Sequence, residues 1–341
     1  TALVIVKDDR SRQRRISRMV AWLVVLSLMG YPLLGTLVAL TPFPSLVASV
    51  PLRLAVIFFS LYLLVSMRRF PVTPVRVVLL LFWFVYVCRL IWDWQVAQIP
   101  EAGSALLFLS VVGLLPALAL LGMAPRYWDA HAFAKLAFFT GAATCAIAVS
   151  ATLLGLGGER SLIEQTGRLS FDTVNPISFG HVAVTTLLAG LVGWSDKTRR
   201  PLMLAVVAAG SIAALVCLQL AASKGPVVAL AVCILALGVF MPRYRWLLFA
   251  LLPVAILFLF FADEGNLAQR FSGAEEDLST ILRRELLTNA ITQFLQHPLL
   301  GSAFVETEMQ TYPHNPFVEA AMATGIIGVS LYALVIIACV S

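Results

Sequence analysis

The feature that most constrains the fold is a succession of apolar segments, most of them about 17–25 residues long. One such segment is enough for a helix to cross the ~30 Å hydrocarbon core of a bilayer. The segments lack two-residue alternation of polar and apolar side chains, which favours helices over barrel strands. The chain is 60% hydrophobic and 12% charged, whereas soluble domains carry about 25% charged residues. We therefore predict an all-α, polytopic transmembrane helical bundle that forms a single membrane domain over residues 1–341.

About ten spans can be placed along the chain. They cover residues 19–40, 52–67, 77–92, 104–123, 136–156, 177–194, 202–222, 227–241, 246–262 and 317–340. Two longer polar intervals separate some of them, residues 157–176 and residues 263–316.

The basic residues follow alternate connections between these spans. The connections that hold Arg68, Arg69 and Arg76, then Arg126 and Lys135, and then the run 197–200 fall on the same predicted face as the basic N-terminal segment. The positive-inside rule assigns that face to the cytoplasm. The net charge of +6 is thus explained by topology, and nucleic-acid binding is not needed. Both longer polar intervals then lie outside.

Several familiar kinds of site are missing from the sequence. The five cysteines lie in apolar segments without CxxC spacing, and the four histidines are scattered, so neither a disulfide framework nor a metal site is predicted. No GxxxxGK[ST], GxSxG or HExxH motif occurs, which argues against an ATPase, a serine hydrolase and a zincin. Charges are nearly absent from the middle of the spans, which disfavours an ion-coupled transporter without excluding a transporter.

The cations on the external face need a reason, because the positive-inside rule depletes them there. Lys224 follows Ser223 in a very tight junction between two spans, where a lysine beside a helix N-terminus can bind an anion. The same lysine could instead extend its ammonium to the membrane surface. Arg168 lies in the earlier external interval, near Asn175-Pro176. It is either positioned for a ligand or part of an ordered loop.

The second external interval contains a predicted amphipathic helix over residues 282–296, which begins with Arg283 and Arg284. An arginine fork matches phosphate oxygens, but an interfacial helix can also use arginines to hold lipid headgroups. His314 precedes the last span, and Glu319 lies one turn into it. A histidine there can act as a base, hold a phosphate, or be structural. Arg270 belongs to the same interval.

These residues resemble the O-antigen ligase/polymerase superfamily. The motifs that carry the resemblance lie between Arg168 and Gly328. In order they are Arg168-Leu169 with Asn175-Pro176, Ser223-Lys224-Gly225-Pro226, Arg283, His297-Pro298-Leu299-Leu300-Gly301, His314-Asn315 with Glu319, and Thr324-Gly325-Ile326-Ile327-Gly328. The N-terminal half contributes hydropathy only.

The resemblance implies a multi-pass glycosyltransferase of the bacterial inner membrane, with a cytoplasmic N-terminus and a periplasmic site. Members of this family have about twelve helices, so about two C-terminal helices are expected beyond the ten. They move a glycan from undecaprenyl pyrophosphate to an acceptor hydroxyl, without metal or cofactor. In polymerases the acceptor is another lipid-linked repeat unit, and in ligases it is lipid A–core.

Site residues are carried over by position in the motifs. The resemblance implies that Lys224 and Arg283 bind the pyrophosphate and that His314 acts at the acceptor hydroxyl or on the diphosphate. Arg168, Arg284, Asn315 and Glu319 are implied as substrate-binding residues. The chain has Lys224 where the family usually has arginine, and Leu287 where an aromatic residue is common, which leaves Arg284 open as an alternative to Arg283. The polymerase is the preferred hypothesis, the ligase is the alternative, and a lipid-linked glycan or small-molecule transporter is a further one.

Overall fold

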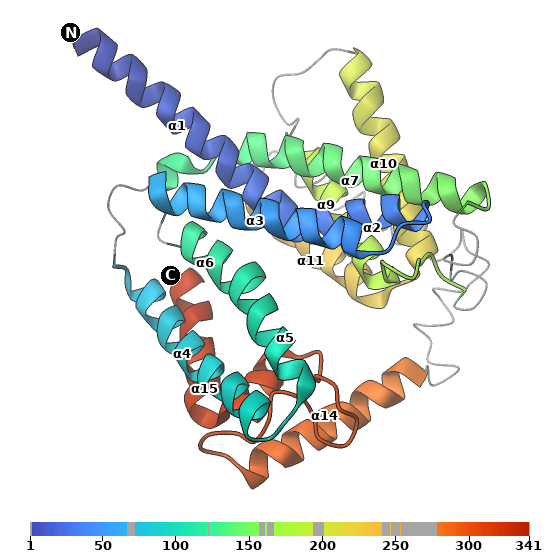
Figure 1. Cartoon of the computed structure of the whole chain (residues 1–341). Helices are drawn as coiled ribbons and strands as arrows, with labels where there is room; N and C mark the ends of the chain where they lie inside the picture. The colour runs from blue at the N-terminus through green and yellow to red at the C-terminus, as the bar shows by residue number, and fades with distance from the viewer. Residues whose placement is uncertain are drawn as a thin grey trace. The chain divides into compact units, whose positions relative to one another are not determined.

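A computed structural model of the chain describes residues 2–66, 72–121, 123–156, 161, 167–193, 201–240, 246, 253 and 278–340. Within these ranges every extended regular element is a helix, and the only strand-like pairings are isolated bridges such as Phe171 with Val174. Figure 1 shows the helices in chain order. The predicted all-helical class is confirmed.

The predicted spans agree well with the helices. Eight described helices are long and apolar enough to cross a membrane, within the ranges 11–39, 46–66, 74–95, 100–120, 130–153, 176–193, 201–221 and 316–339. A shorter apolar helix at Lys224–Phe240 corresponds to the predicted span 227–241. The predicted span 246–262 lies outside the described residues, apart from Trp246 and Pro253. The chain is therefore a polytopic helical membrane protein, as predicted, and its orientation stays a prediction.

The chain divides into two compact units, and the first boundary along the chain falls within helix α3 (Leu46–Ser66). The first unit contains residues 1–59 and 125–275, and the second contains residues 60–124 and 276–341.

The first unit is a helical bundle built around α7 (Ala130–Leu153) and α9 (Pro176–Gly193). Against them pack α1 (Ala2–Val25), α2 (Tyr31–Ala39), α10 (Pro201–Ala221) and α11 (Lys224–Phe240). A π-helical turn, Leu26–Gly30, joins α1 to α2. The core contains Phe138, Phe179 and Leu218, which are fully buried.

Small residues allow α7 and α9 to approach each other closely. A Cβ atom built on Gly141 of α7 would lie 1.9 Å from Thr186 Oγ1 of α9 and 2.6 Å from Met29 Cε. Helices in membranes gain much of their association from such close packing, because lipid is as apolar as the side chains themselves.

The second unit is built on α4 (Pro74–Gln95) and α15 (Pro316–Val340), which pack together. It also contains α5 (Pro100–Phe108), the π-helical segment Leu109–Leu114, α6 (Leu115–Leu120) and α14 (Leu278–Gln296). Its core joins Tyr86 and Leu90 of α4 to Phe304 and Val305, which lie between α14 and α15. The predicted helix 282–296 is thus present and begins four residues earlier, at Leu278.

The position of one buried arginine in the second unit differs from the prediction. The sequence places Arg76 in a connecting loop, but it lies in the first turn of α4 and is only 1% exposed. Its Nη2 donates to the Leu118 carbonyl of α6 at 3.2 Å.

The close approach at Gly141 makes a direct stability prediction. Gly141→Val should lower the free energy of unfolding by about 2 kcal/mol, because the added side chain overlaps Thr186 and Met29. Ala146→Val enlarges an exposed side chain of the same helix and should have little effect. Thermal unfolding in detergent compares the two. Equal melting temperatures for both variants would contradict the close packing of α7 and α9 at Gly141.

Candidate functional site

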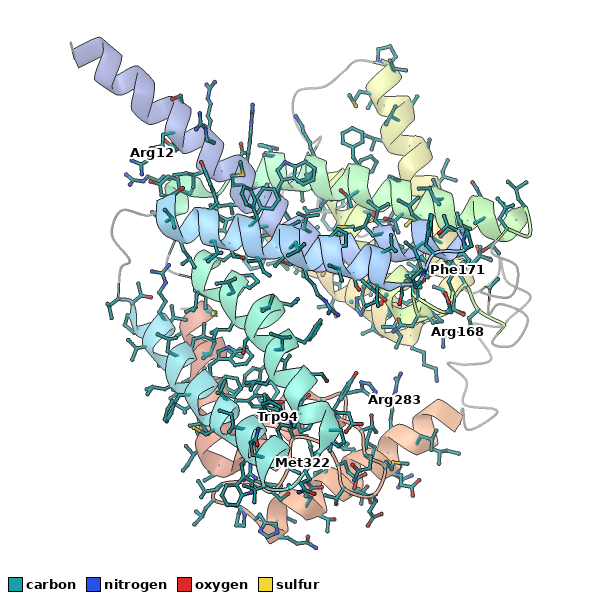
Figure 2. The ribbon with its side chains drawn as sticks, viewed as in Figure 1. Arg12, Trp94, Arg168, Phe171, Arg283 and Met322 are labelled. Atoms are coloured by element: carbon teal, nitrogen blue, oxygen red, sulfur yellow. The ribbon has the colours of Figure 1, made fainter. Side chains whose placement is uncertain are left out.

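Arg168 is bound to the end of helix α10 in the first unit. Its Nε donates to the Ala221 carbonyl at 3.0 Å, and its Nη2 donates to Ser223 Oγ. The next residue supports the same arrangement, because the Leu169 N–H donates to the Leu220 carbonyl at 2.8 Å. Two motifs that lie far apart in the sequence are therefore in direct contact. Figure 2 shows Arg168 and Phe171 in this loop.

The loop that carries Arg168 is anchored at both ends. Leu169, Phe171 and Val174 are buried in the core of the first unit. Thr173 Oγ1 donates to the Gly35 carbonyl at 3.0 Å. Asn175 Oδ1 accepts from the Ser178 N–H at 2.8 Å, so the Asn175-Pro176 pair forms the start of α9. The ordered-loop interpretation is therefore confirmed, and a contact of Arg168 with a ligand stays a prediction.

Lys224 lies at a sharp junction between α10 and α11. Ala222 has a positive φ of 43° and donates its N–H to the Gln219 carbonyl, which ends α10. Pro226 then packs on α9, where a Cβ on Gly180 would lie 2.6 Å from Pro226 Cγ. Lys224 is half-buried, whereas Gly225 is exposed and a Cβ there would meet no atom within 4 Å. One side of the α11 N-terminus is thus open.

This end of the first unit has the chemistry of an anion site. A helix N-terminus carries partial positive charge and free N–H donors. Arg168 and Lys224 bring two cationic side chains to the same junction, and they are connected through Ser223. The structure therefore brings together two of the predicted site residues.

Helix α14 of the second unit presents its two arginines differently. The buried side chains Leu286, Ala290 and Gln293 define the face that packs on the unit. At about 100° per residue, Arg283 lies roughly 50° from the centre of that face and Arg284 roughly 150° from it. Both side chains are exposed. Arg283 therefore projects beside the packed face, and Arg284 projects away from it.

The segment 297–301 is locked to α15 through two glycines. Gly301 has a φ of 69°, and a Cβ there would lie 2.4 Å from the Ala323 carbonyl carbon. Gly325 has a φ of 66° and interrupts α15, and a Cβ there would lie 2.2 Å from the Leu299 carbonyl oxygen. The Ser302 N–H donates to the Met322 carbonyl at 3.0 Å, and the Ile326 N–H donates to the Pro298 carbonyl at 2.8 Å. Two of the motifs that carry the family resemblance, residues 297–301 and 324–328, are therefore packed together. We call this contact the joint.

Arg89 and Asp93 of α4 complete this joint, and sequence reasoning gave them no role. Arg89 Nη1 donates to the Ser302 carbonyl at 2.7 Å, and its Nη2 donates to the Leu300 and Gly301 carbonyls at 3.1 Å each. The two side chains form an ion pair at 3.3 Å. Asp93 is fully buried, and its Oδ2 accepts from the Phe304 N–H at 2.8 Å. The sequence feature that could have predicted this ion pair is the spacing of four residues between an arginine and an aspartate in an apolar helix.

A cavity of about 910 Å³ lies beside the joint. Arg89, Trp92 and His297 line it, together with residues 298–302. Its wall is therefore partly apolar and partly cationic.

His314 lies at the entry to α15 in a strained conformation. Its φ is 55°, which is uncommon for a residue with a side chain. The imidazole is exposed and meets the Tyr312 ring edge-to-face at 4.9 Å between centroids. Asn315 Oδ1 accepts from the Phe317 N–H at 3.1 Å and so caps α15. The carboxylate of Glu319 accepts from the Tyr86 hydroxyl at 3.0 Å.

The structure thus places Arg168 and Lys224 in the first unit, and Arg283, Arg284, His314, Asn315 and Glu319 in the second. That Lys224 and Arg283 bind one lipid diphosphate together stays a prediction. Arg270 lies outside the described residues. Among the residues that the structure describes, no group of three or more His, Cys, Asp or Glu side chains is placed to hold a metal ion.

The joint in the second unit gives a further prediction. Arg89→Met should lower the free energy of unfolding by about 3 kcal/mol, because it removes the partner of a buried carboxylate and of three carbonyls. Arg284→Met removes an exposed arginine and should change stability by less than about 0.5 kcal/mol. Thermal unfolding and the rate of proteolysis between residues 297 and 315 provide the comparison. An Arg89→Met protein as stable and as resistant as the Arg284→Met protein would show that the joint does not depend on Arg89.

Comparison with known proteins adds one finding. Residues 209–333, less than half of the chain, match the family described as O-Antigen ligase. The matched segment includes the Lys224 junction, α14 with Arg283, the interlocked glycines and His314, but not Arg168. No curated protein and no solved structure gave a match. The match to residues 209–333 confirms the resemblance of this chain to the O-antigen ligase/polymerase superfamily.

Proposed function

We propose that the protein is an inverting glycosyltransferase that moves a glycan from undecaprenyl pyrophosphate to an acceptor hydroxyl at the periplasmic face of the bacterial inner membrane. The acceptor is another lipid-linked glycan, which makes the enzyme a surface-polysaccharide polymerase. The proposal includes no metal and no cofactor. The observation that carries it is the contact of Arg168 with Ser223, which brings two of the proposed cationic residues to the open N-terminus of α11.

The first unit supplies the donor site in this proposal. Lys224 binds the pyrophosphate, with the N-terminal N–H groups of α11 as further donors. Arg168 contributes to donor or glycan binding and at the same time holds the junction, since its guanidinium donates to Ala221 and Ser223.

The second unit supplies the other charged groups. Arg283 binds the pyrophosphate, and its position beside the packed face of α14 favours it over Arg284. His314 acts at the acceptor hydroxyl or on the diphosphate. Asn315 and Glu319 fix the start of α15 next to His314, so their effect on substrate binding includes holding this histidine in its strained position.

The reaction breaks the bond between sugar C1 and the diphosphate oxygen, and it forms a bond between C1 and the acceptor oxygen. Attack from the side opposite the leaving group inverts the anomeric centre. Negative charge grows on the departing diphosphate, and fixed cations such as Lys224 and Arg283 stabilise it. The acceptor proton passes to His314 when that residue acts as the base.

Replacement of the cations tests the proposal. Lys224→Ala and Arg283→Ala should each lower glycan transfer in membranes by at least about a hundredfold, because each removes charge that stabilises the leaving group. Lys224→Arg keeps the charge and should retain most of the transfer. Arg284→Ala should retain it as well, since that side chain projects away from the packed face. The assay follows new glycosidic bonds on a labelled lipid-linked donor.

Arg15→Ala is a matched control, because Arg15 is an exposed cation of α1 with no role in the proposal. Wild-type transfer by the Lys224→Ala and Arg283→Ala proteins would remove the assignment. Movement of labelled glycan across the membrane without new glycosidic bonds would support the transporter alternative instead.

The ligase alternative shares the same chemistry and differs in the acceptor. A strain that lacks the protein separates the two. Surface polysaccharide reduced to single repeat units indicates a lost polymerase. Long glycan that accumulates without attachment to lipid A–core indicates a lost ligase, and it would overturn the polymerase assignment.

A further inference from the structure

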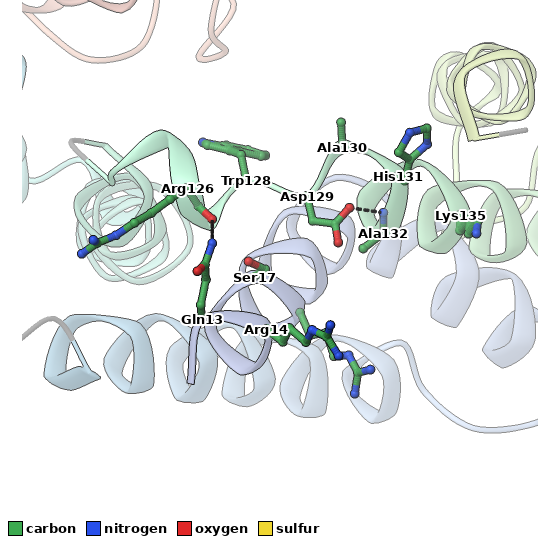
Figure 3. A pocket seen from close by; sticks show the side chains of 11 residues that line it. Gln13, Arg14, Ser17, Arg126, Trp128, Asp129, Ala130, His131, Ala132 and Lys135 are labelled. Atoms are coloured by element: carbon green, nitrogen blue, oxygen red, sulfur yellow. Dashed lines mark hydrogen bonds between the residues drawn. The ribbon is translucent and has the colours of Figure 1, made fainter. Parts of the chain in front are cut away.

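A second cationic site lies in the first unit, where helices α1 and α7 begin their spans. A cavity of about 910 Å³ opens there (Figure 3). Among its lining residues are Arg14 and Arg18 of α1, Arg126 and Trp128 of the connecting turn, and His131 and Lys135 of α7. None of these residues belongs to the segment that matches the O-antigen ligase family.

The walls of this cavity are held together by specific contacts. Gln13 Nε2 donates to the Arg126 carbonyl at 2.8 Å, which ties α1 to the turn before α7. Asp129 Oδ1 accepts from the Ala132 N–H at 2.9 Å and caps α7. Both hydrogen bonds are drawn in Figure 3. The basic residues are therefore presented by a defined framework.

The charge inside the cavity is not balanced by carboxylates. Asp129 is the only acidic residue among those that line it, and its Oδ1 already accepts the N–H that caps α7. In the part of the chain that the structure describes, Arg14, Arg18 and Lys135 form no ion pair. A cavity with several unneutralised cations and one engaged carboxylate attracts an anion.

An apolar groove of about 270 Å³ continues from the cavity. Arg18 and Lys135 line both spaces, and the groove adds the side chains of Trp22, Leu136 and Phe139. Along both helices the lining changes from basic to apolar in the direction of the span. The combined shape suits a molecule with an anionic end and a hydrocarbon end.

We propose that this site binds a membrane phospholipid with a net negative headgroup. Arg18 and Lys135, at the boundary of the two spaces, bind its phosphate, and Arg14 faces the outer part of the headgroup. One acyl chain lies in the groove beside Trp22 and Phe139. Trp128 lies at the level of the headgroups, where tryptophan is favoured. Anionic lipids are abundant in the cytoplasmic leaflet, the face to which the sequence assigns these cations. This inference does not depend on the proposed glycosyltransferase reaction.

The test uses the full chain in nanodiscs of phosphatidylcholine with increasing fractions of phosphatidylglycerol. Native mass spectrometry counts the phosphatidylglycerol that stays bound, and thermal unfolding reports its effect on stability. The wild type should retain phosphatidylglycerol in preference to phosphatidylcholine, with a melting temperature about 3 °C higher or more. In the double variant Arg18→Gln/Lys135→Gln the half-saturating fraction of phosphatidylglycerol should rise at least about tenfold.

Two further variants make the result specific. Arg12→Gln/Arg15→Gln removes the same charge from exposed positions of α1 that do not line the cavity, and it should bind like the wild type. Arg18→Lys/Lys135→Arg keeps the charge and should also bind. An equal loss of phosphatidylglycerol binding in Arg18→Gln/Lys135→Gln and Arg12→Gln/Arg15→Gln would mean that the lipid is attracted by surface charge in general. That result would overturn the site. A melting temperature raised equally by inorganic phosphate alone would show that free phosphate is the ligand, and it would overturn the lipid proposal.

Discussion

The structure depends on side chains that supply hydrogen-bond partners to backbone groups outside the helices. In lipid an unpaired carbonyl or N–H costs several kcal/mol, so spans are helical throughout unless something else supplies partners. The second unit has such an exception, because α15 is interrupted at Gly325 and the segment 297–304, which lies outside any helix, packs against it. Arg89 and Asp93 supply the partners: three carbonyls bind the guanidinium, and the Phe304 N–H binds the carboxylate. Their ion pair leaves neither charge isolated.

The same requirement explains Arg168. The last carbonyls of a helix have no partner within the helix, and at the end of α10 the guanidinium of Arg168 donates to the Ala221 carbonyl. Because Ser223 accepts from the same side chain, the arginine also fixes the direction in which α11 leaves the junction. Loss of Arg168 would therefore change the position of Lys224 before it removed any contact with a ligand. An Arg168 substitution can therefore lower activity either by displacing Lys224 or by removing a contact with the donor. A change in donor binding without a change in stability would indicate the lost contact.

The sequence is sufficient for features that depend on neighbouring residues. Span positions and the helix over residues 282–296 follow from local hydropathy, and both agree with the structure. The joint around Arg89 cannot be found in this way, because its partners lie more than two hundred residues along the chain. Gly325 belongs to a recognisable motif, but an apolar segment with glycines looks like an ordinary span, so nothing indicates its positive φ. Charge usually marks the end of a span, which is why the sequence places Arg76 in a loop, whereas its partner, the Leu118 carbonyl, allows it to be buried.

Several arginines and lysines in the described part of the chain differ in what their charged groups contact. Arg76, Arg89 and Arg168 donate to carbonyl oxygens of their own unit. Arg14, Arg18, Lys135, Lys224 and Arg283 have no ion pair with any residue that the structure describes. Cations that gather without carboxylate partners repel one another, and an anionic ligand offsets that repulsion. Within the first unit cations gather in two places, Lys224 with Arg168 at the start of α11 and Arg18 with Lys135 beside the cavity, and a phosphate is the simplest complement to either pair.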